Sequence, residues 1–233
     1  MEALQIQTGV GVTSLRKERL LLTHMPIRFD ADPSVEKVEV DDYVKQRFAE
    51  VYNATIDTFE PYILSTSNDK GISATIGFQP AATKKPLFLE NYLTSTVEET
   101  LAVVLKQDVK REHIVEVGNL SSSDKGGASR ILFILSVAIL HQADFKWVTF
   151  TATNQVQRLL SKLNLTTVSI CEADPTELTD RGESWGSYYT DRPQVVVGNL
   201  SDAIEQLKCH KVINSILDNY QNTIIAVANQ IAL

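Results

Sequence analysis

Two spacings of hydrophobic positions alternate along this chain. Short runs with the two-residue period of a sheet, or with continuous β-branched character, predict strands at residues 19–29, 62–65, 72–78, 87–92, 114–117, 146–151, 167–171 and 194–197. Runs with helical spacing predict helices at residues 41–59, 95–105, 128–140, 154–163 and, as one or two helices, 201–231. The mixed order predicts an α/β (α+β) fold with a central sheet flanked by helices.

Local signals mark the ends of several elements. Pro61 is expected to stop the first helix, because proline lacks the backbone N–H that a helix interior needs. The run Ser-Asn-Asp-Lys-Gly at 67–71 predicts the turn of a hairpin. Ser95 with Glu98, three residues on, predicts a capping box at the start of the second helix.

A hinge at Gly198 and Asn199 precedes the C-terminal helical pattern. We therefore expect one domain at residues 1–200 and a helical segment at residues 201–233. This segment packs either on the core of the same chain or on a partner subunit. In the second case the chain forms a homodimer.

The stretch 113–141 combines a β-branched strand, a loop of small residues and an apolar helix. The N–H groups of a Gly-rich turn and of the following helix N-terminus can hold a pyrophosphate. Gly126, Gly127 and Ala128 match neither the Walker nor the Rossmann spacing, which argues against a nucleoside triphosphate or NAD. A plain strand-to-helix turn that uses glycine for positive φ angles is the alternative.

The charge and composition narrow the functional classes. A formal net charge of -7 argues against non-specific binding of nucleic acid or of anionic lipid. Two distant cysteines and four scattered histidines give neither a disulfide framework nor a zinc spacing, so we expect no metal. The N-terminus lacks the pattern of a signal peptide, and the longest apolar stretch, 131–140, is about half of a membrane span. A cytoplasmic protein without a transmembrane segment is expected.

The order of the elements resembles the acyl-coenzyme A N-acyltransferase (GNAT) fold. In that fold, a loop of the form Gln/Arg-x-x-Gly-x-Gly/Ala binds the pyrophosphate of the cofactor. Residues 123–128 keep the Gly-x-Ala half, and Ser123 stands where the pattern has Gln or Arg. The resemblance implies donor-binding positions at Gly118, Asn119, Ser123, Lys125, Gly126, Gly127, Ala128 and Arg130. For Arg130, exposure to solvent without any bound ligand is an equally open alternative.

A set of motifs across about residues 40–200 resembles the thermostable haemolysin family. In order, they are FLENYL (88–93), EVGNL (116–120), GGASR (126–130), WVTFTAT (147–153), EADP (172–175) and WGSYY (185–189). The family name comes from a lytic activity. Its fold resemblance, shared distantly with acyl-homoserine-lactone synthases, implies acyl transfer from acyl-coenzyme A or acyl carrier protein to a small amine acceptor.

Glu116 is the leading candidate for a catalytic base. It lies among apolar residues of a strand, where partial burial raises the pKa of a carboxyl toward a value useful for a general base. Amine acylation needs such a base, because an ammonium must lose a proton before it attacks a thioester. Glu90, in another apolar run, is the second candidate. A structural ion pair to Lys or Arg is the alternative for Glu116.

Three further groups of residues have either a role near the thioester or a purely structural one. A bulge at Gly118 and Asn119 turns N–H groups toward the thioester carbonyl, or the strand merely ends there. Thr149 and Thr151 line the same cleft as Glu116, or serve only as strand formers. The aromatic loop residues Trp185, Tyr188 and Tyr189 wall a substrate pocket, with Tyr188 protonating the leaving thiolate, or they plug the core.

Three functions therefore compete. The first is a GNAT-like acyltransferase. The second is a membrane-active haemolysin, for which secretion would be expected and for which residues 213–233 are the only amphipathic candidate. The third is a non-catalytic module that binds acyl thioesters, for which Ser123 is the main argument.

Overall fold

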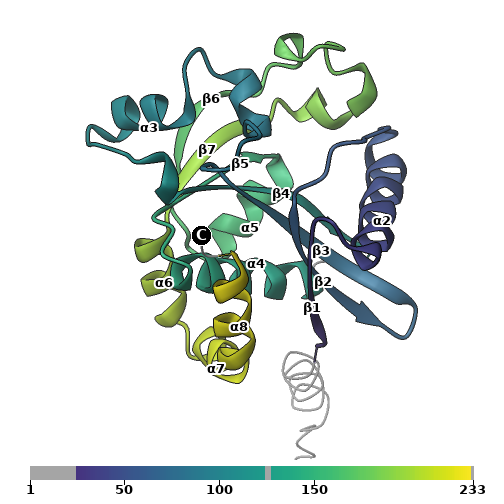
Figure 1. The fold of residues 1–233 in the computed structure, drawn as a ribbon, viewed down its shortest axis with the longest axis vertical. Coiled ribbons are helices and arrows are strands. Elements are labelled where there is room, and N and C mark those ends of the chain that lie inside the picture. The colour runs from purple at the N-terminus through teal and green to yellow at the C-terminus, as the bar shows by residue number, and fades with distance from the viewer. Residues whose placement is uncertain (1–24, 124–126, 232–233) are drawn as a thin grey trace, which may run out of the picture.

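A central sheet organises the described part of the chain, residues 25–123 and 127–231, in a computed structural model. Its strands are β1 (Ile27–Ala31), β2 (Tyr62–Asn68), β3 (Gly71–Pro80), β4 (Ile114–Ser122), β5 (Trp147–Ala152), β6 (Val168–Glu172) and β7 (Gln194–Asn199). They form one sheet in the order β1-β2-β3-β4-β5-β7-β6 (Figure 1). Every neighbouring pair is antiparallel except β4 and β5, which are parallel.

Helices cover both faces of this sheet. They are α2 (Val35–Tyr52), α3 (Val97–Leu105), α4 (Gly127–Gln142), α5 (Asn154–Lys162), α6 (Leu200–Lys208), α7 (Lys211–Asn219) and α8 (Gln221–Ile231). Leu64 of β2 faces the core that contains α4, whereas its neighbour Ile63 faces the core that contains α2. The expected central mixed sheet flanked by helices is therefore confirmed.

Helix α4 is apolar on nearly every side because it is covered on nearly every side. Ala128 and residues 131–140 are all buried. One side of α4 packs on the sheet, and the other side packs against the C-terminal helices through residues such as Ile204, Ile216 and Ile224, which belong to the same core cluster. Figure 1 shows α6, α7 and α8 grouped beside α4. A domain boundary at residue 200 stays a prediction.

The parallel strands β4 and β5 separate after a short contact. Their pairing covers only Ile114 to Glu116, opposite Trp147 to Thr149. Further along β4, Gly77 faces Gly118 and Thr75 faces Ser121, so that two residues of β4 oppose one residue of β3. This β-bulge includes Asn119, which has φ 48°. The expected bulge at Gly118 and Asn119 is present, and it bends β4 away from β5.

Several element boundaries differ from those expected. The first helix ends at Tyr52 rather than near Pro61, because Asn53 takes φ 54° and its N–H donates to Ala49 O and Phe48 O. The expected strand at 87–92 is wrong: Phe88–Tyr92 form a 3-10 helix.

Smaller shifts occur elsewhere. The capping box of α3 is formed by Thr96 and Glu99, one residue later than expected. The C-terminal pattern forms three helices instead of one or two. The hairpin of β2 and β3 is confirmed, with Gly71 at φ 105° in the turn. The predicted strand at 19–29 becomes β1, and its residues 19–24 lie outside the described part of the chain.

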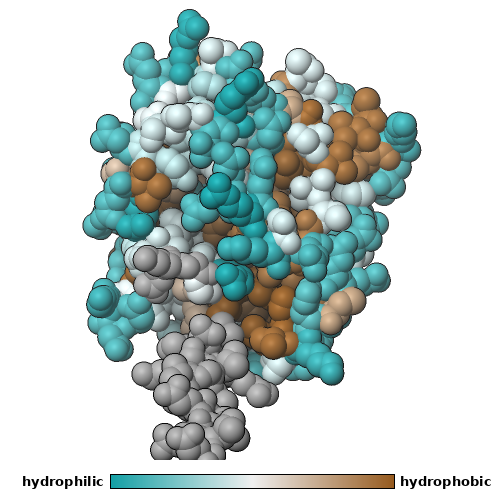
Figure 2. Space-filling model, turned by 180° about the vertical axis from the view of Figure 1, so that it is seen from behind, coloured by the Kyte–Doolittle hydropathy of each residue, from teal (hydrophilic) through white to brown (hydrophobic). Residues whose placement is uncertain are grey.

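The described helices contain none that combines the length and the hydropathy needed to cross a membrane. The face of the molecule behind the view of Figure 1 is largely hydrophilic, and hydrophobic side chains show in a recessed area near its middle (Figure 2). Apolar residues of α7 and α8 such as Ile216, Leu217 and Val227 are buried in the core and are not presented to a membrane.

Two neighbouring isoleucines of α8 test whether this helix belongs to the core. Ile224 is 4% exposed and Ile225 is 40% exposed. Replacing Ile224 with Ala should lower the free energy of unfolding by about 2–5 kcal/mol, because a cavity is left in the core. Ile225→Ala should cost less than about 1 kcal/mol. Urea unfolding followed by tryptophan fluorescence measures both, and equal small losses would mean that α8 is not part of the core.

Candidate active site

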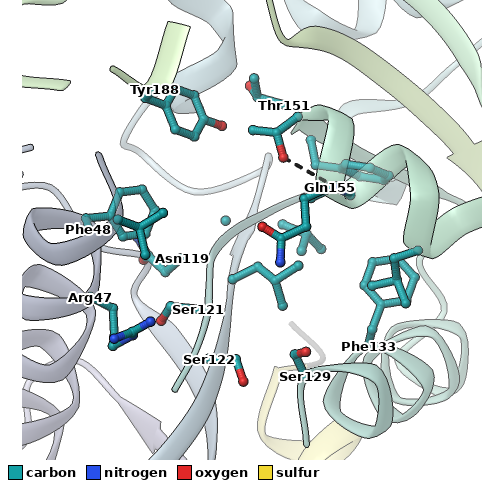
Figure 3. Close-up of a pocket in the computed structure, with 18 of the residues that line it drawn as sticks. Arg47, Phe48, Asn119, Ser121, Ser122, Ser129, Phe133, Thr151, Gln155 and Tyr188 are labelled. Carbon is teal, nitrogen blue, oxygen red and sulfur yellow. Dashed lines mark hydrogen bonds between the residues drawn. The ribbon is translucent and has the colours of Figure 1, made fainter. Parts of the chain in front are cut away.

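A cavity of about 670 Å³ lies where β4 and β5 separate. Its walls come from both faces of the sheet, since α2 contributes Arg47 and Phe48 while α4 contributes Ser129 and Phe133 (Figure 3). Residues 117–123 at the end of β4 form its floor. The cavity therefore passes through the sheet at the gap between the two parallel strands.

Glu116 lines this cavity from the last position at which β4 pairs with β5. Its side chain is 4% exposed. Oε1 accepts a hydrogen bond of 3.0 Å from the N–H of Leu89, whereas buried Oε2 has no hydrogen-bond partner among the described residues. Burial first, and then the neighbouring Glu60, raise the pKa of Glu116 well above its usual value. No ion pair to Lys or Arg within residues 25–123 and 127–231 accounts for it.

Glu60 is a second carboxyl of the cavity, and no sequence pattern predicted it. It stands in the segment between α2 and β2 and is 8% exposed. Its side chain crosses β3 and β4 over two glycines. A Cβ atom on Gly77 would lie 2.7 Å from Glu60 Cβ, and one on Gly118 would lie 3.2 Å from Glu60 Cδ and still closer to its Oε1. Only glycine at these two positions leaves room for Glu60.

The Asn119 side chain of the bulge holds the segment that carries Glu60. Asn119 Oδ1 accepts a hydrogen bond of 2.7 Å from the N–H of Glu60, and Asn119 O accepts one of 2.9 Å from the Thr75 hydroxyl. Burial raises the pKa of Glu60 to about 7, against the opposing effect of Lys85 and Lys37. A Glu between Phe59 and Pro61 carries no motif in the sequence, which is why this residue was not predicted.

Aromatic side chains wall the cavity on the side of the loop 183–191. Trp185 and Tyr188 line it together with Phe48 and Tyr52 of α2 and Phe88. The Tyr188 and Tyr52 rings meet edge-on with centroids 5.1 Å apart. The Tyr188 hydroxyl points into the cavity (Figure 3).

The two tyrosines of this loop differ in position. Tyr189 does not line the cavity; its hydroxyl is hydrogen bonded to that of Tyr92. Burial raises the pKa of Tyr189 to about 12 and raises that of Tyr188 further. Both phenols therefore keep their protons at neutral pH. Trp185 and Tyr188 line the cavity, as predicted for a substrate pocket. Tyr189 lies outside it and packs its ring against those of Trp185 and Tyr188.

Four cationic side chains line the cavity. They are Arg47 of α2, Arg130 of α4, and Arg158 and Lys162 of α5. Arg47 forms an ion pair with Glu50 through Nη1, while its buried Nε has no hydrogen-bond partner among the described residues. Its guanidinium points toward Ser121 (Figure 3). In a chain with a net charge of -7, this grouping favours an anionic ligand.

The predicted donor-binding residues fall into three groups. Gly118, Asn119, Ser123 and Arg130 line the cavity. Gly127 is exposed at the start of α4, and Ala128 is buried in the core, so neither forms the wall. Lys125 and Gly126 lie outside the described residues.

Thr149 and Thr151, both predicted to line the cleft, take different positions. Thr151 lines the cavity. Thr149 is fully buried outside it, and its hydroxyl donates to Val115 O at 3.3 Å. The difference arises because β5 still pairs with β4 at Thr149 and has left it at Thr151.

Glu90 occupies a structural position. It lies in the 3-10 helix, where Arg111 donates to both of its carboxylate oxygens and the N–H groups of Leu87 and Val97 donate to them as well. Despite partial burial, these hydrogen bonds lower the pKa of Glu90. A carboxylate with a lowered pKa accepts protons poorly, so these contacts indicate a structural ion pair with Arg111 rather than a role as base.

Groups of three or more His, Cys, Asp or Glu side chains that could hold a metal ion are absent from the described residues. The cavity therefore offers carboxyl, hydroxyl, guanidinium and aromatic groups as its chemistry.

Comparison with known proteins gives a family and a fold. A family model described as "Thermostable hemolysin" matches residues 31–204. The AHL synthase LasI aligns with a TM-score of 0.52 at 15% identity, over 76% of this chain and 90% of that one. FeeM, an N-acyl amino acid synthase from uncultured soil microbes, aligns with a TM-score of 0.50 at 11% identity, over 78% and 96%.

A third structure adds ligands to this comparison. It is the CoA-dependent acyl-homoserine lactone synthase BjaI with SAM and isopentyl-CoA, with a TM-score of 0.50 at 9% identity over 89% of this chain and 100% of that one. At these identities the likeness is one of fold, and it confirms the expected GNAT-like fold. Curated proteins gave no match.

Two glycines near the cavity should respond differently to alanine. Gly118→Ala should destabilise the protein by about 1–3 kcal/mol, because the added methyl group collides with the Glu60 carboxylate. Gly127→Ala meets no atom within 4 Å and should be neutral or stabilising by up to about 1 kcal/mol, because Ala favours the helix. Thermal unfolding of both variants measures this. A neutral Gly118→Ala would show that Glu60 does not lie against β4.

Proposed function

The chain belongs to the thermostable haemolysin family, and we propose that it is an acyltransferase that moves an acyl group from an acyl thioester to an amine. The observation that carries this proposal is the cavity between the separated strands, lined by the buried carboxyl of Glu116, whose Oε2 has no hydrogen-bond partner among the described residues. The neighbouring carboxyls of Glu116 and Glu60, both with a raised pKa, form a pair that can take a proton from an ammonium, which must be neutral before it attacks a thioester.

The donor is proposed to extend along β4. The acyl-thioester end meets Glu116, and the phosphate end meets the cations and hydroxyl groups near Arg47, Ser121 and Ser123. Acyl-coenzyme A and acyl carrier protein both carry such a phosphate on a pantetheine arm. The similar structure of BjaI holds isopentyl-CoA, as its description states, which supports a thioester of this class.

The bulge and the aromatic wall would serve the reaction. Beyond Glu116 the backbone of β4 is no longer paired with β5, so N–H groups near Gly118 and Asn119 can face the thioester carbonyl and stabilise the negative charge that develops on its oxygen. Tyr188, which keeps its proton, can donate it to the departing thiolate. The amine acceptor would approach between these groups.

Binding of the donor tests this proposal first. Titration calorimetry with acyl-coenzyme A and with acyl carrier protein, at several acyl lengths, should detect a complex of this protein. Arg47→Gln should weaken it by roughly 10- to 100-fold, because a charged hydrogen-bond donor to the phosphate is lost. Lys45→Gln, on the same helix but exposed and outside the cavity, is the matched control and should not change affinity. If no acyl thioester binds the parent protein, the proposal fails.

Membrane lysis is the second candidate, and the family description is what favours it. The apolar residues of α7 and α8 that a lytic helix would need are buried against α4. Lysis can also be indirect, since an N-acylated amine with a long chain is a surfactant.

A red-cell assay separates direct from indirect lysis. The purified protein alone should not release haemoglobin, and release should appear only after incubation with a long-chain acyl donor and an amine. Arg47→Gln, which weakens donor binding, should reduce the indirect lysis at limiting donor concentration. Release by the parent protein without a donor, retained in Arg47→Gln, would support a membrane-active haemolysin instead.

A further inference from the structure

We propose that Glu60 is a second catalytic carboxyl of this site, and that Glu60 and Glu116 hold a single proton between them, with the negative charge on Glu60. The inference rests on the proposed acyl transfer for its catalytic part. Its electrostatic part stands on the structure of the two carboxyls and can be tested without turnover.

The two buried side chains lie against the same cavity and on the same side of β4. Gly118 is two residues after Glu116 and on the same side of β4, and the Glu60 carboxylate lies directly over Gly118. Both side chains are buried, and both line the cavity. Two carboxylates that close together in a poorly solvated place cannot both be ionised, so one of them keeps a proton.

The surroundings decide which carboxyl carries the charge. Two cations, Lys85 beyond the end of β3 and Lys37 of α2, stabilise the ionised form of Glu60, although Lys37 also forms ion pairs with Asp41 and Asp32. Glu116 faces the acidic groups Glu60 and Glu90 and lies near the phenols of Tyr92 and Tyr188. The backbone N–H groups of Leu89 and Phe88 oppose this effect by lowering the pKa of Glu116. The proton therefore belongs on Glu116.

Fold stability gives no reason for the carboxylate of Glu60. The hydrogen bond that fixes this segment uses the backbone N–H of Glu60, and no described residue donates a hydrogen bond to its side chain. Burying a charge without partners costs stability. Side chains of this kind cluster at functional sites.

Glu60 also has a route for protons. Besides the main cavity it lines a second one of about 300 Å³, together with exposed Lys85 and with Gln79, Phe88 and Asn91. A proton taken up at Glu60 from the main cavity can leave through the second, without passing the bound donor.

In the proposed acyl transfer, every proton has a donor and an acceptor. The acceptor ammonium gives one proton to Glu60, and its nitrogen lone pair attacks the thioester carbon. The C–N bond forms and the C–S bond breaks. The thiolate takes a proton from Tyr188, and the second proton of the acylated nitrogen returns to that phenolate. One proton, held on Glu60, is released to solvent, and Glu116 stays protonated as a neutral hydrogen-bonding neighbour.

Turnover of three variants tests the catalytic role. Glu60→Gln should lower the rate at pH 7 by at least roughly 100-fold, the typical contribution of a general base. Glu116→Gln imitates the protonated acid, so it should lose less than about 10-fold and keep the rise of rate with pH near 7. Asp57→Asn, an exposed carboxyl on the same segment, is the control and should be unchanged. Glu60→Gln with at least half of the parent rate would overturn the role of Glu60.

The dependence of stability on pH tests the shared proton without any substrate. The pKa of Glu60 is raised in the folded state, so its contribution to stability is present below about pH 4.5 and is lost as pH rises through about 7. The thermal midpoint of the parent should fall over this range. Glu60→Gln should fall less and be the more stable protein at pH 8.

Identical pH dependence of the two proteins would overturn the shared proton. An altered pH dependence in a protein that transfers no acyl group would leave the pair intact and reject the proposed function instead. The two failures are therefore distinguishable.

Discussion

The separation of β4 from β5 is the constraint on which the rest of the site depends. Two parallel strands that remained paired would fill the middle of the sheet with backbone hydrogen bonds and leave no space for a ligand. Here the pairing stops at Glu116 and Thr149, and the bulge at Asn119 turns β4 aside. The same bulge holds the segment of Glu60 through the Asn119 side chain, so one local irregularity opens the cavity and places a carboxyl in it.

A buried pair of carboxyls is costly, and the fold around it compensates. The helix α4 and the three C-terminal helices bury a continuous apolar core on one face of the sheet. The aromatic loop 183–191, α2 and the 3-10 helix close the other face. The stability of these packed elements offsets the cost of burying two carboxyl groups. Active sites commonly contain such destabilising groups at the expense of stability.

The sequence predicted the fold of this protein more completely than it predicted the candidate site. Periodicity located most strands and helices, and the apolar character of residues 131–140 correctly indicated a helix covered on all sides. It failed at 87–92, where the hydrophobic run reads as a strand but Glu90 binds Arg111 and the N–H groups of Leu87 and Val97 in a 3-10 helix. Glu116 was found because a carboxyl is conspicuous in a strand. Glu60 and Arg47 were not, because they lie about 56 and 70 residues before Glu116 in the chain, and only the three-dimensional fold brings them to the cavity.

The central claim is that the gap between β4 and β5 holds an acyl thioester with its carbonyl beside the two carboxyls. A crystal structure of the protein with a non-reactive acyl-coenzyme A analogue tests it most directly. The account predicts the thioester carbonyl near the N–H groups of Gly118 and Asn119, the phosphates near Arg47, and Glu60 and Glu116 facing the open side where an amine would enter. An analogue bound elsewhere on the protein, with the gap empty, would contradict it.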